Sequence, residues 1–180
     1  KKLDNIRLKG EDIEKGARVF SNGDKVSAAV VGVLASLGIK QVLVNKGPVI
    51  GVISTGSELI EIDKEITFGK VRDSNSYSLC AQIIETGSSY IRYGIIEDDK
   101  KKLNLAIKKA VSECDIVLIS GGVSVGDYDY IKDILNELKA GKIFWSVNQK
   151  PGKPLAFYVL ENKLIFGLPG NPVSAMVCFE

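Results

Sequence analysis

The sequence contains no histidine among its 180 residues, and it contains only three cysteines. The lack of histidine excludes a Ser-His-Asp triad, a histidine-ligated zinc site and an imidazole general base. Chemistry must therefore come from carboxylates, lysines, hydroxyls and backbone dipoles, or from a hard metal ion such as Mg²⁺. Cys80, Cys114 and Cys178 lie far apart and form no C-x-x-C pair. We therefore expect reduced core thiols in a cytoplasmic protein.

Long hydrophobic runs and an excess of one charge are also absent. No apolar run approaches the ~20 residues that a membrane helix needs, and the N-terminal stretch KKLDNIRLKG lacks the apolar region of a secretory signal. The 24 basic and 22 acidic residues are interspersed along the chain, which does not indicate binding to nucleic acid. The composition predicts a soluble globular protein with neither a nucleic-acid nor a membrane partner.

The chain changes character near Pro48. Residues 1–47 carry several turn signals, a helix that begins after Ser27 and ends at Gly38, and a short strand over residues 41–44. We interpret residues 1–47 as part of a small β-rich subdomain that leads into the core.

Residues 48–180 alternate apolar runs of strand length with helical periodicity. The expected strands span residues 49–53, 90–96, 116–119 and 143–147, and the expected helices span residues 75–86, 100–113 and 128–138. Uninterrupted β-branched strands that alternate with helices predict an α/β domain with a mostly parallel sheet covered on both faces.

The remaining residues predict a hairpin, with strands at residues 155–160 and 163–168, and then a last helix from Asn171-Pro172. That helix shows no stop signal before Glu180, so we expect the chain to be a piece of a longer protein.

Three glycine-containing loops each follow an expected strand and precede a helix. Alone, each loop is typical of a tight turn. In a parallel sheet, however, all three meet at the carboxyl edge, where open α/β sheets bind ligands and where helix N-termini favour anions. The predicted ligand-binding residues are Ser54, Thr55, Gly56, Ser57 and Glu58 in the first loop, Ser120, Gly121, Gly122, Ser124 and Gly126 in the second, and Pro169, Gly170, Asn171 and Pro172 in the third.

Charged residues accompany these loops. Asp127 and Asp129 follow the glycines of the second loop and would repel an anion. Either a metal ion lies between them and the ligand, or they accept hydrogen bonds from donors on a polar ring. The segment KPGKP offers Lys150 and Lys153 on a backbone stiffened by two prolines. The segment RDSN indicates first of all the start of a helix, with Asp73 or Ser74 as the cap.

Five motifs occur in the order STGSELIE, KVRDSN, SGGVSVGDYDY, KPGKPL and GLPGNPVSA. In this order and spacing they resemble the molybdopterin-binding domain of molybdopterin molybdenumtransferases, the family that includes the C-terminal enzyme domain of gephyrin. The third motif alone would also fit molybdopterin adenylyltransferases and a domain of competence-damage proteins.

The resemblance implies a three-layer α/β/α domain that holds adenylylated molybdopterin. With Mg²⁺ such enzymes use molybdate and release AMP, and the full-length protein forms a homodimer in which a neighbouring subunit closes the site. The residues that the resemblance assigns are Asp129, Asp73, Lys150 and Lys153 for catalysis, Asp129 and Asp127 for the metal, and Ser74 and Asn75 as further binding residues.

One residue departs from the family pattern. Ser57 stands where many members have the aspartate of T-G-D-E-L. Because serine carries no negative charge, Asp73 or Glu58 is expected to make the contact that the aspartate makes elsewhere.

Two alternatives stay open at this point. One is a molybdopterin adenylyltransferase, which residues 1–47 disfavour because that type of enzyme usually stands as a bare domain. The other is a non-catalytic binding or scaffold module of the same fold. As a piece of a molybdenumtransferase, this 180-residue chain is expected to bind ligand weakly without completing the transfer.

Overall fold

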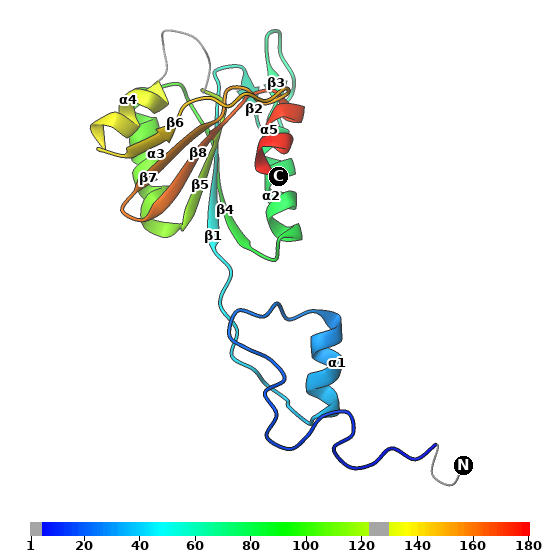
Figure 1. Cartoon of the computed structure of the whole chain (residues 1–180). Coiled ribbons are helices and arrows are strands. Elements are labelled where there is room, and N and C mark those ends of the chain that lie inside the picture. Colours follow the sequence, from blue (N-terminus) through cyan, green and yellow to red (C-terminus); the bar gives the residue numbers. More distant parts are fainter. Residues whose placement is uncertain (1–4, 123–129) are drawn as a thin grey trace. The chain divides into compact units, whose positions relative to one another are not determined.

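The structure is a computed structural model that describes residues 5–122 and 130–180. It divides into two compact units, Lys1–Asn45 and Lys46–Glu180 (Figure 1). The predicted boundary after residue 47 lies two residues from this division.

The first unit contains one helix among its described residues, α1 (Ala28–Ser36). The hydroxyl of Ser27 caps it by accepting a hydrogen bond from the Val30 N–H at 3.4 Å. At the other end Gly38 adopts a φ of 73°, and the Ile39 N–H donates to the Leu34 carbonyl at 2.9 Å. This is a Schellman motif, in which glycine takes the left-handed conformation. Both predicted ends of the helix are confirmed.

The prediction of a strand over residues 41–44 is wrong. The described residues of the first unit form no strand, and the Leu43 side chain there is fully exposed. A strand needs a neighbour that accepts and donates its backbone hydrogen bonds, and no described segment of the unit pairs with these residues. The described part of this unit is helix and turns, so the expected β-rich character is absent from it.

The second unit is built on a six-stranded sheet with the order β4-β1-β5-β8-β7-β6. The strands are β1 (Val49–Thr55), β4 (Ser89–Ile96), β5 (Ile116–Ser120), β6 (Gly141–Phe144), β7 (Ala156–Leu160) and β8 (Lys163–Leu168). Strands β4, β1, β5 and β8 run parallel, β7 pairs antiparallel with β8, and β6 pairs antiparallel with β7 at the edge of the sheet. The predicted mostly parallel sheet is confirmed, and the strand expected at residues 143–147 is shifted toward the N-terminus.

Helices cover both faces of this sheet (Figure 1). On one face lie α2 (Asn75–Glu85) and α5 (Pro172–Phe179), and on the other lie α3 (Lys100–Glu113) and α4 (Tyr130–Glu137). Neighbouring residues of β1 alternate between the two cores, since Val52 packs toward α2 and Ile53 toward α3. Burial on both faces explains why β1 reads as an uninterrupted apolar run. The three-layer α/β/α arrangement is confirmed.

A small element was absent from the prediction. Strands β2 (Leu59–Ile60) and β3 (Val71–Arg72) pair in parallel and form a separate two-stranded sheet. The Val71 N–H donates to the Glu58 carbonyl, and the Asp73 N–H donates to the Ile60 carbonyl, both at 2.9 Å. Strands of two residues are too short for a periodicity to reveal. We call residues 56–72, which run from the end of β1 to the start of α2, the ribbon segment.

Of the helices that the structure describes, none combines the length and the apolar composition that a membrane span requires.

Candidate functional site

The carboxyl ends of three parallel strands lie side by side. In register, Ser54 of β1 stands opposite Ser120 of β5, which stands opposite Leu168 of β8. Two hollows open at this edge, one of about 250 Å³ and one of about 580 Å³. Both are lined by Thr55, Glu58, Gly121 and Gly170. The structure therefore brings the three predicted loops together.

The remaining lining residues divide between the two hollows. The smaller hollow adds Leu59, Val71, Arg72, Asp73, Ser74, Asn75, Ser120 and Pro172, and the larger adds Gly56, Asp98, Gly122, Pro154, Pro169, Asn171 and Ser174. The backbone of Gly121 has a φ of 89°, and a Cβ there would overlap the carbonyl oxygen of Thr55. Only glycine lets the loop after β5 approach the loop after β1 this closely.

Asn75 ties these loops to one another. Its Nδ2 donates to the Ser120 hydroxyl at 2.8 Å and to the Gly170 carbonyl at 2.9 Å, and the residue is buried. Both amide hydrogens are thereby used inside the protein. Asn75 was predicted as a binding residue, and its hydrogen bonds give it a positioning role at the start of α2.

Asp73 is almost completely buried, with 1% of its side chain exposed. Its carboxylate accepts hydrogen bonds from the Ser76 N–H at 3.1 Å and the Ser76 hydroxyl at 2.6 Å, and from the Arg92 guanidinium at 3.4 Å. The hydroxyl of Ser74 makes no capping bond. The geometry therefore agrees with the interpretation of Asp73 as the cap of α2, while its catalytic role stays a prediction.

Sequence reasoning missed Asp98. The Thr55 hydroxyl donates to Asp98 Oδ1 at 2.6 Å, and the Ser57 N–H donates to Oδ2 at 3.1 Å. Asp98 also lines a third hollow of about 160 Å³ beside Tyr130. One signal was available, because the segment Glu97-Asp98-Asp99 follows β4 and precedes α3 and so forms a fourth loop at the carboxyl edge.

Ser54 lies beneath the site rather than on its surface. The residue has no exposed area, and its hydroxyl has no hydrogen-bond partner among the described residues. Ser54 shares the face of β1 that packs against α2, with Val52. A ligand in either hollow would contact Thr55, and one in the larger hollow would also contact Gly56, whereas Ser54 lines neither hollow.

The two predicted lysines stand on an exposed turn. Lys150 and Lys153 are exposed, and neither forms an ion pair with a described residue. Between them, the buried Gly152 carbonyl accepts a hydrogen bond from the Cys178 thiol of α5 at 3.4 Å, which anchors the turn. Pro154 brings the end of the turn to the larger hollow. Both ammonium groups are thus free to meet an anion.

Four predicted residues, Ser124, Gly126, Asp127 and Asp129, lie outside the described residues. Their assignments as ligand-binding and metal-binding residues stay predictions. Within residues 5–122 and 130–180, no group of three or more acidic or cysteine side chains is arranged to hold a metal ion.

The cysteines take no part in the site chemistry. Cys80 and Cys114 are buried, as predicted, and Cys178 is half-buried. Burial raises the pKa of the Cys80 thiol to about 11 and also raises the pKa values of Cys114 and Cys178. Thiols with raised pKa values are poor nucleophiles at neutral pH.

Comparison with known proteins identifies the family. A family model described as "Probable molybdopterin binding domain" matches residues 51–180. The molybdopterin molybdenumtransferase of Staphylococcus epidermidis is 39% identical over 180 residues, which are 100% of this chain and 43% of that protein. The enzyme of the same name from Haemophilus influenzae is 41% identical over 97% of this chain and 43% of its own length. The chain thus spans less than half the length of these curated relatives.

Solved structures agree with the fold. A molybdopterin biosynthesis moeA protein from Pyrococcus horikoshii superposes with a TM-score of 0.81 at 36% identity, over 94% of this chain and 42% of that one. A MoaB protein from Pyrococcus furiosus, 16% identical with a TM-score of 0.56 over 76% of this chain and 90% of that one, shares the fold alone. Since the family model covers the strands, helices and loops of the carboxyl edge, the chain belongs to the family of molybdopterin-binding domains.

Proposed function

We propose that this chain is the molybdopterin-binding part of a molybdopterin molybdenumtransferase, which takes part in molybdenum cofactor biosynthesis. Adenylylated molybdopterin binds at the carboxyl edge of the sheet, and the full-length enzyme inserts molybdate and releases AMP. One observation carries this proposal: the family match over residues 51–180 includes every loop that lines the two hollows.

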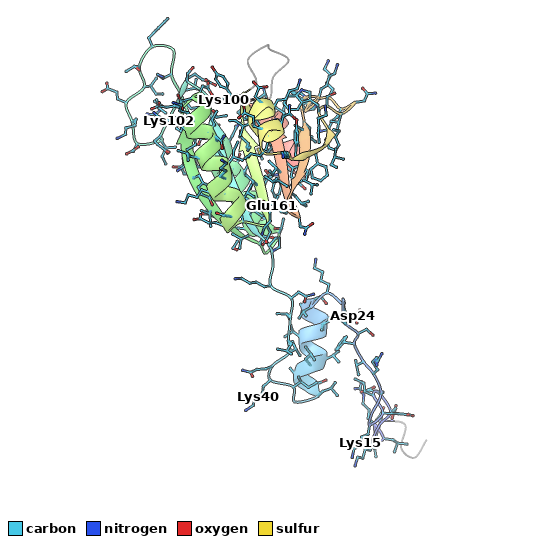
Figure 2. The ribbon with its side chains drawn as sticks, turned by 90° about the vertical axis from the view of Figure 1, so that its left-hand side faces the viewer. Lys15, Asp24, Lys40, Lys100, Lys102 and Glu161 are labelled. Atoms are coloured by element: carbon cyan, nitrogen blue, oxygen red, sulfur yellow. The ribbon has the colours of Figure 1, made fainter. Side chains whose placement is uncertain are left out.

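The edge suits an anionic ligand. Helices α2, α3 and α5 all begin there, and the positive ends of their dipoles favour anions. Lys100 and Lys102 also lie at this end of the sheet (Figure 2), but they form ion pairs with Glu137 and Glu97. Lys150 and Lys153 add two positive charges that form no ion pair with a described residue and would bind the pyrophosphate of the ligand or molybdate.

The acidic residues at the edge fit a hard cation. Carboxylate oxygens are the ligands that Mg²⁺ prefers, and Asp98 and Glu58 present such oxygens at the larger hollow. Asp127 and Asp129 are the further predicted ligands. When bound, Mg²⁺ would supply positive charge that offsets the negative charge of the phosphate and molybdate oxygens.

The chain's own groups have separate tasks in this proposal. An oxygen of molybdate or of water attacks one phosphorus of the phosphoanhydride between AMP and the molybdopterin phosphate. As the new P–O bond forms, the bridging P–O bond breaks, and negative charge grows on the leaving phosphate. Lys150 and Lys153 stabilise that charge, because preformed positive groups lower the barrier where charge develops. Asp98 holds Thr55 and Ser57 in place, so that their loop keeps a fixed contour against the ligand.

The resemblance also supports a homodimer of the full-length protein in the cytoplasm. Reduced thiols persist in that compartment, and the three cysteines of this chain form no disulfide with one another.

The test is AMP release by the full-length protein supplied with adenylylated molybdopterin and Mg²⁺. We expect release that depends on added molybdate and that yields molybdenum-containing cofactor. Formation of adenylylated molybdopterin from ATP would instead identify an adenylyltransferase. Ligand binding without either reaction would identify a binding module.

A further inference from the structure

Arg92 of β4 lies at the centre of a polar cluster behind the smaller hollow. Its Nη2 donates to Glu61 Oε2 at 2.7 Å and to Asp73 Oδ2 at 3.4 Å, and its Nε donates to the Ser76 hydroxyl at 2.7 Å. The guanidinium also lies 4.4 Å from the centre of the Tyr77 ring. Only 23% of the Arg92 side chain is exposed. One side chain thus contacts four others from two different segments.

These partners belong to parts of the fold that build the site. Asp73 caps α2, and Ser76 and Tyr77 lie in its first turn; Ser74 and Asn75 at this end of the helix line the smaller hollow. Glu61 belongs to the ribbon segment, whose Glu58 and Arg72 line another wall of the same hollow. Arg92 therefore connects two walls of one hollow to a strand of the central sheet.

The Ser57 backbone N–H of the ribbon segment donates to Asp98 at 3.1 Å, but the other bonds that ribbon side chains form stay inside the segment. Lys70 Nζ donates to the Ser57 carbonyl, and Arg72 donates to the carbonyls of Ile62 and Lys64 at 3.0 and 3.1 Å. Among the described residues, Glu61 is the ribbon side chain that forms an ion pair outside the segment. The internal bonds stiffen the ribbon, and the Glu61–Arg92 pair attaches its side chains to the sheet.

We propose that Arg92 is a positioning residue, which through Glu61 and Asp73 fixes the ribbon segment against the start of α2 and so sets the shape of the ligand-binding hollow. The consequence for ligand binding rests on the proposed function, whereas the attachment of the ribbon does not. A planar guanidinium suits this task, because its fork of donors reaches three oxygen-bearing side chains at once. An ammonium group in its place is a single point charge.

Glu61→Ala is the informative variant. Removal of Arg92 would leave the Asp73 carboxylate buried without its charge partner, and a loss of folding would then obscure the result. Glu61→Ala cuts the link to the ribbon and leaves the contacts of Arg92 with Asp73 and Ser76. Glu137→Ala is the matched control, because it removes another glutamate from an ion pair, with Lys100 at 2.6 Å, that joins α3 to α4.

The first measurement is limited trypsin digestion of the full-length protein, because Lys64, Lys70 and Arg72 are cleavage sites within the ribbon segment. We expect Glu61→Ala to raise the initial cleavage rate in this segment at least about fivefold, since cleavage follows the population of the open form. Arg92→Lys should give a smaller increase, and Glu137→Ala none. Cleavage of Glu61→Ala at the wild-type rate would overturn the proposal.

The second measurement separates positioning from simple stabilisation. In the AMP-release assay we expect Glu61→Ala to raise KM for adenylylated molybdopterin about tenfold with a smaller change in kcat, because the walls of the hollow lose their fixed spacing. Faster ribbon cleavage with an unchanged KM would overturn the positioning role. If the wild-type protein releases no AMP, the proposed function fails, and the cleavage rates alone decide whether Arg92 holds the ribbon.

Discussion

The two units differ in how far apart in the sequence their interacting residues lie. In the described part of the first unit, side-chain hydrogen bonds join residues no more than five positions apart, as between Arg7 and Asp12. In the second unit Asn75 bonds to residues 45 and 95 positions away. Helix α1 has no buried residue, whereas Ile53 and Ile107 are completely buried. Local signals suffice to begin and end a helix, but burial requires partners from distant segments.

The largest expected effect tests this difference in burial directly. Ile107→Ala should lower the free energy of unfolding of the 180-residue chain by about 2–5 kcal/mol, because it removes buried methyl groups and leaves a cavity. Val31→Ala, in α1, should change it by no more than about 0.5 kcal/mol, because the Val31 side chain is 54% exposed. Urea denaturation followed by circular dichroism measures both. Equal losses would show that α1 packs in a core of its own.

A smaller effect concerns the long-range hydrogen bonds. Asn75→Ala should lower the free energy of unfolding by about 1–3 kcal/mol, because the buried Ser120 hydroxyl and the Gly170 carbonyl lose their donor. Asp24→Ala removes only a local bond to the Ser21 N–H at an exposed turn and should cost much less. The same denaturation experiment compares the two. A loss for Asp24→Ala as large as that for Asn75→Ala would remove the distinction between local and long-range bonds.

Lys150 and Lys153 of the second unit extend the comparison of the two units from stability to ligand binding. The double variant Lys150→Ala and Lys153→Ala should weaken binding of adenylylated molybdopterin about tenfold, the effect of losing roughly 1.4 kcal/mol of attraction to an anion. Stability should stay constant, since both side chains are exposed. Alanine at Lys15 and Lys40 of the first unit (Figure 2) is the charge-matched control. Calorimetric titration in low salt measures the affinities, and equal weakening by both pairs would point to net charge alone.

An effect confined to alkaline pH belongs to the second unit, which holds all three cysteines. The folded state raises the pKa of Cys80 from 9.0 to about 11, so folding favours the protonated thiol. The resulting stability is fully present below pH 9 and is lost as the pH rises toward 11. We expect the free energy of unfolding to fall less steeply over this interval in Cys80→Ala than in the wild type. Parallel pH profiles would show that Cys80 does not contribute.

Much of this protein follows from the sequence by itself. The cap at Ser27, the stop at Gly38 and the alternation of β-branched strands with helices are signals within a few neighbouring residues, and the structure confirms each of them. The meeting of the three glycine loops was also predictable, because the carboxyl ends of parallel strands share one edge. The prediction of a strand over residues 41–44 was wrong, because apolar residues with high β-propensity indicate a strand but a strand forms only when a neighbouring segment pairs with it.

Only the tertiary structure decided which side chains at that edge act on one another. Asp98 comes within hydrogen-bonding distance of Thr55, 43 positions earlier, because β4 pairs with β1. Asn75 bridges the loops after β5 and β8, and Arg92 joins the ribbon segment to α2. Each contact depends on strand order and on register across the sheet. Strand order and register are set by the burial of apolar residues that lie far apart in the sequence, and no local sequence pattern predicts them.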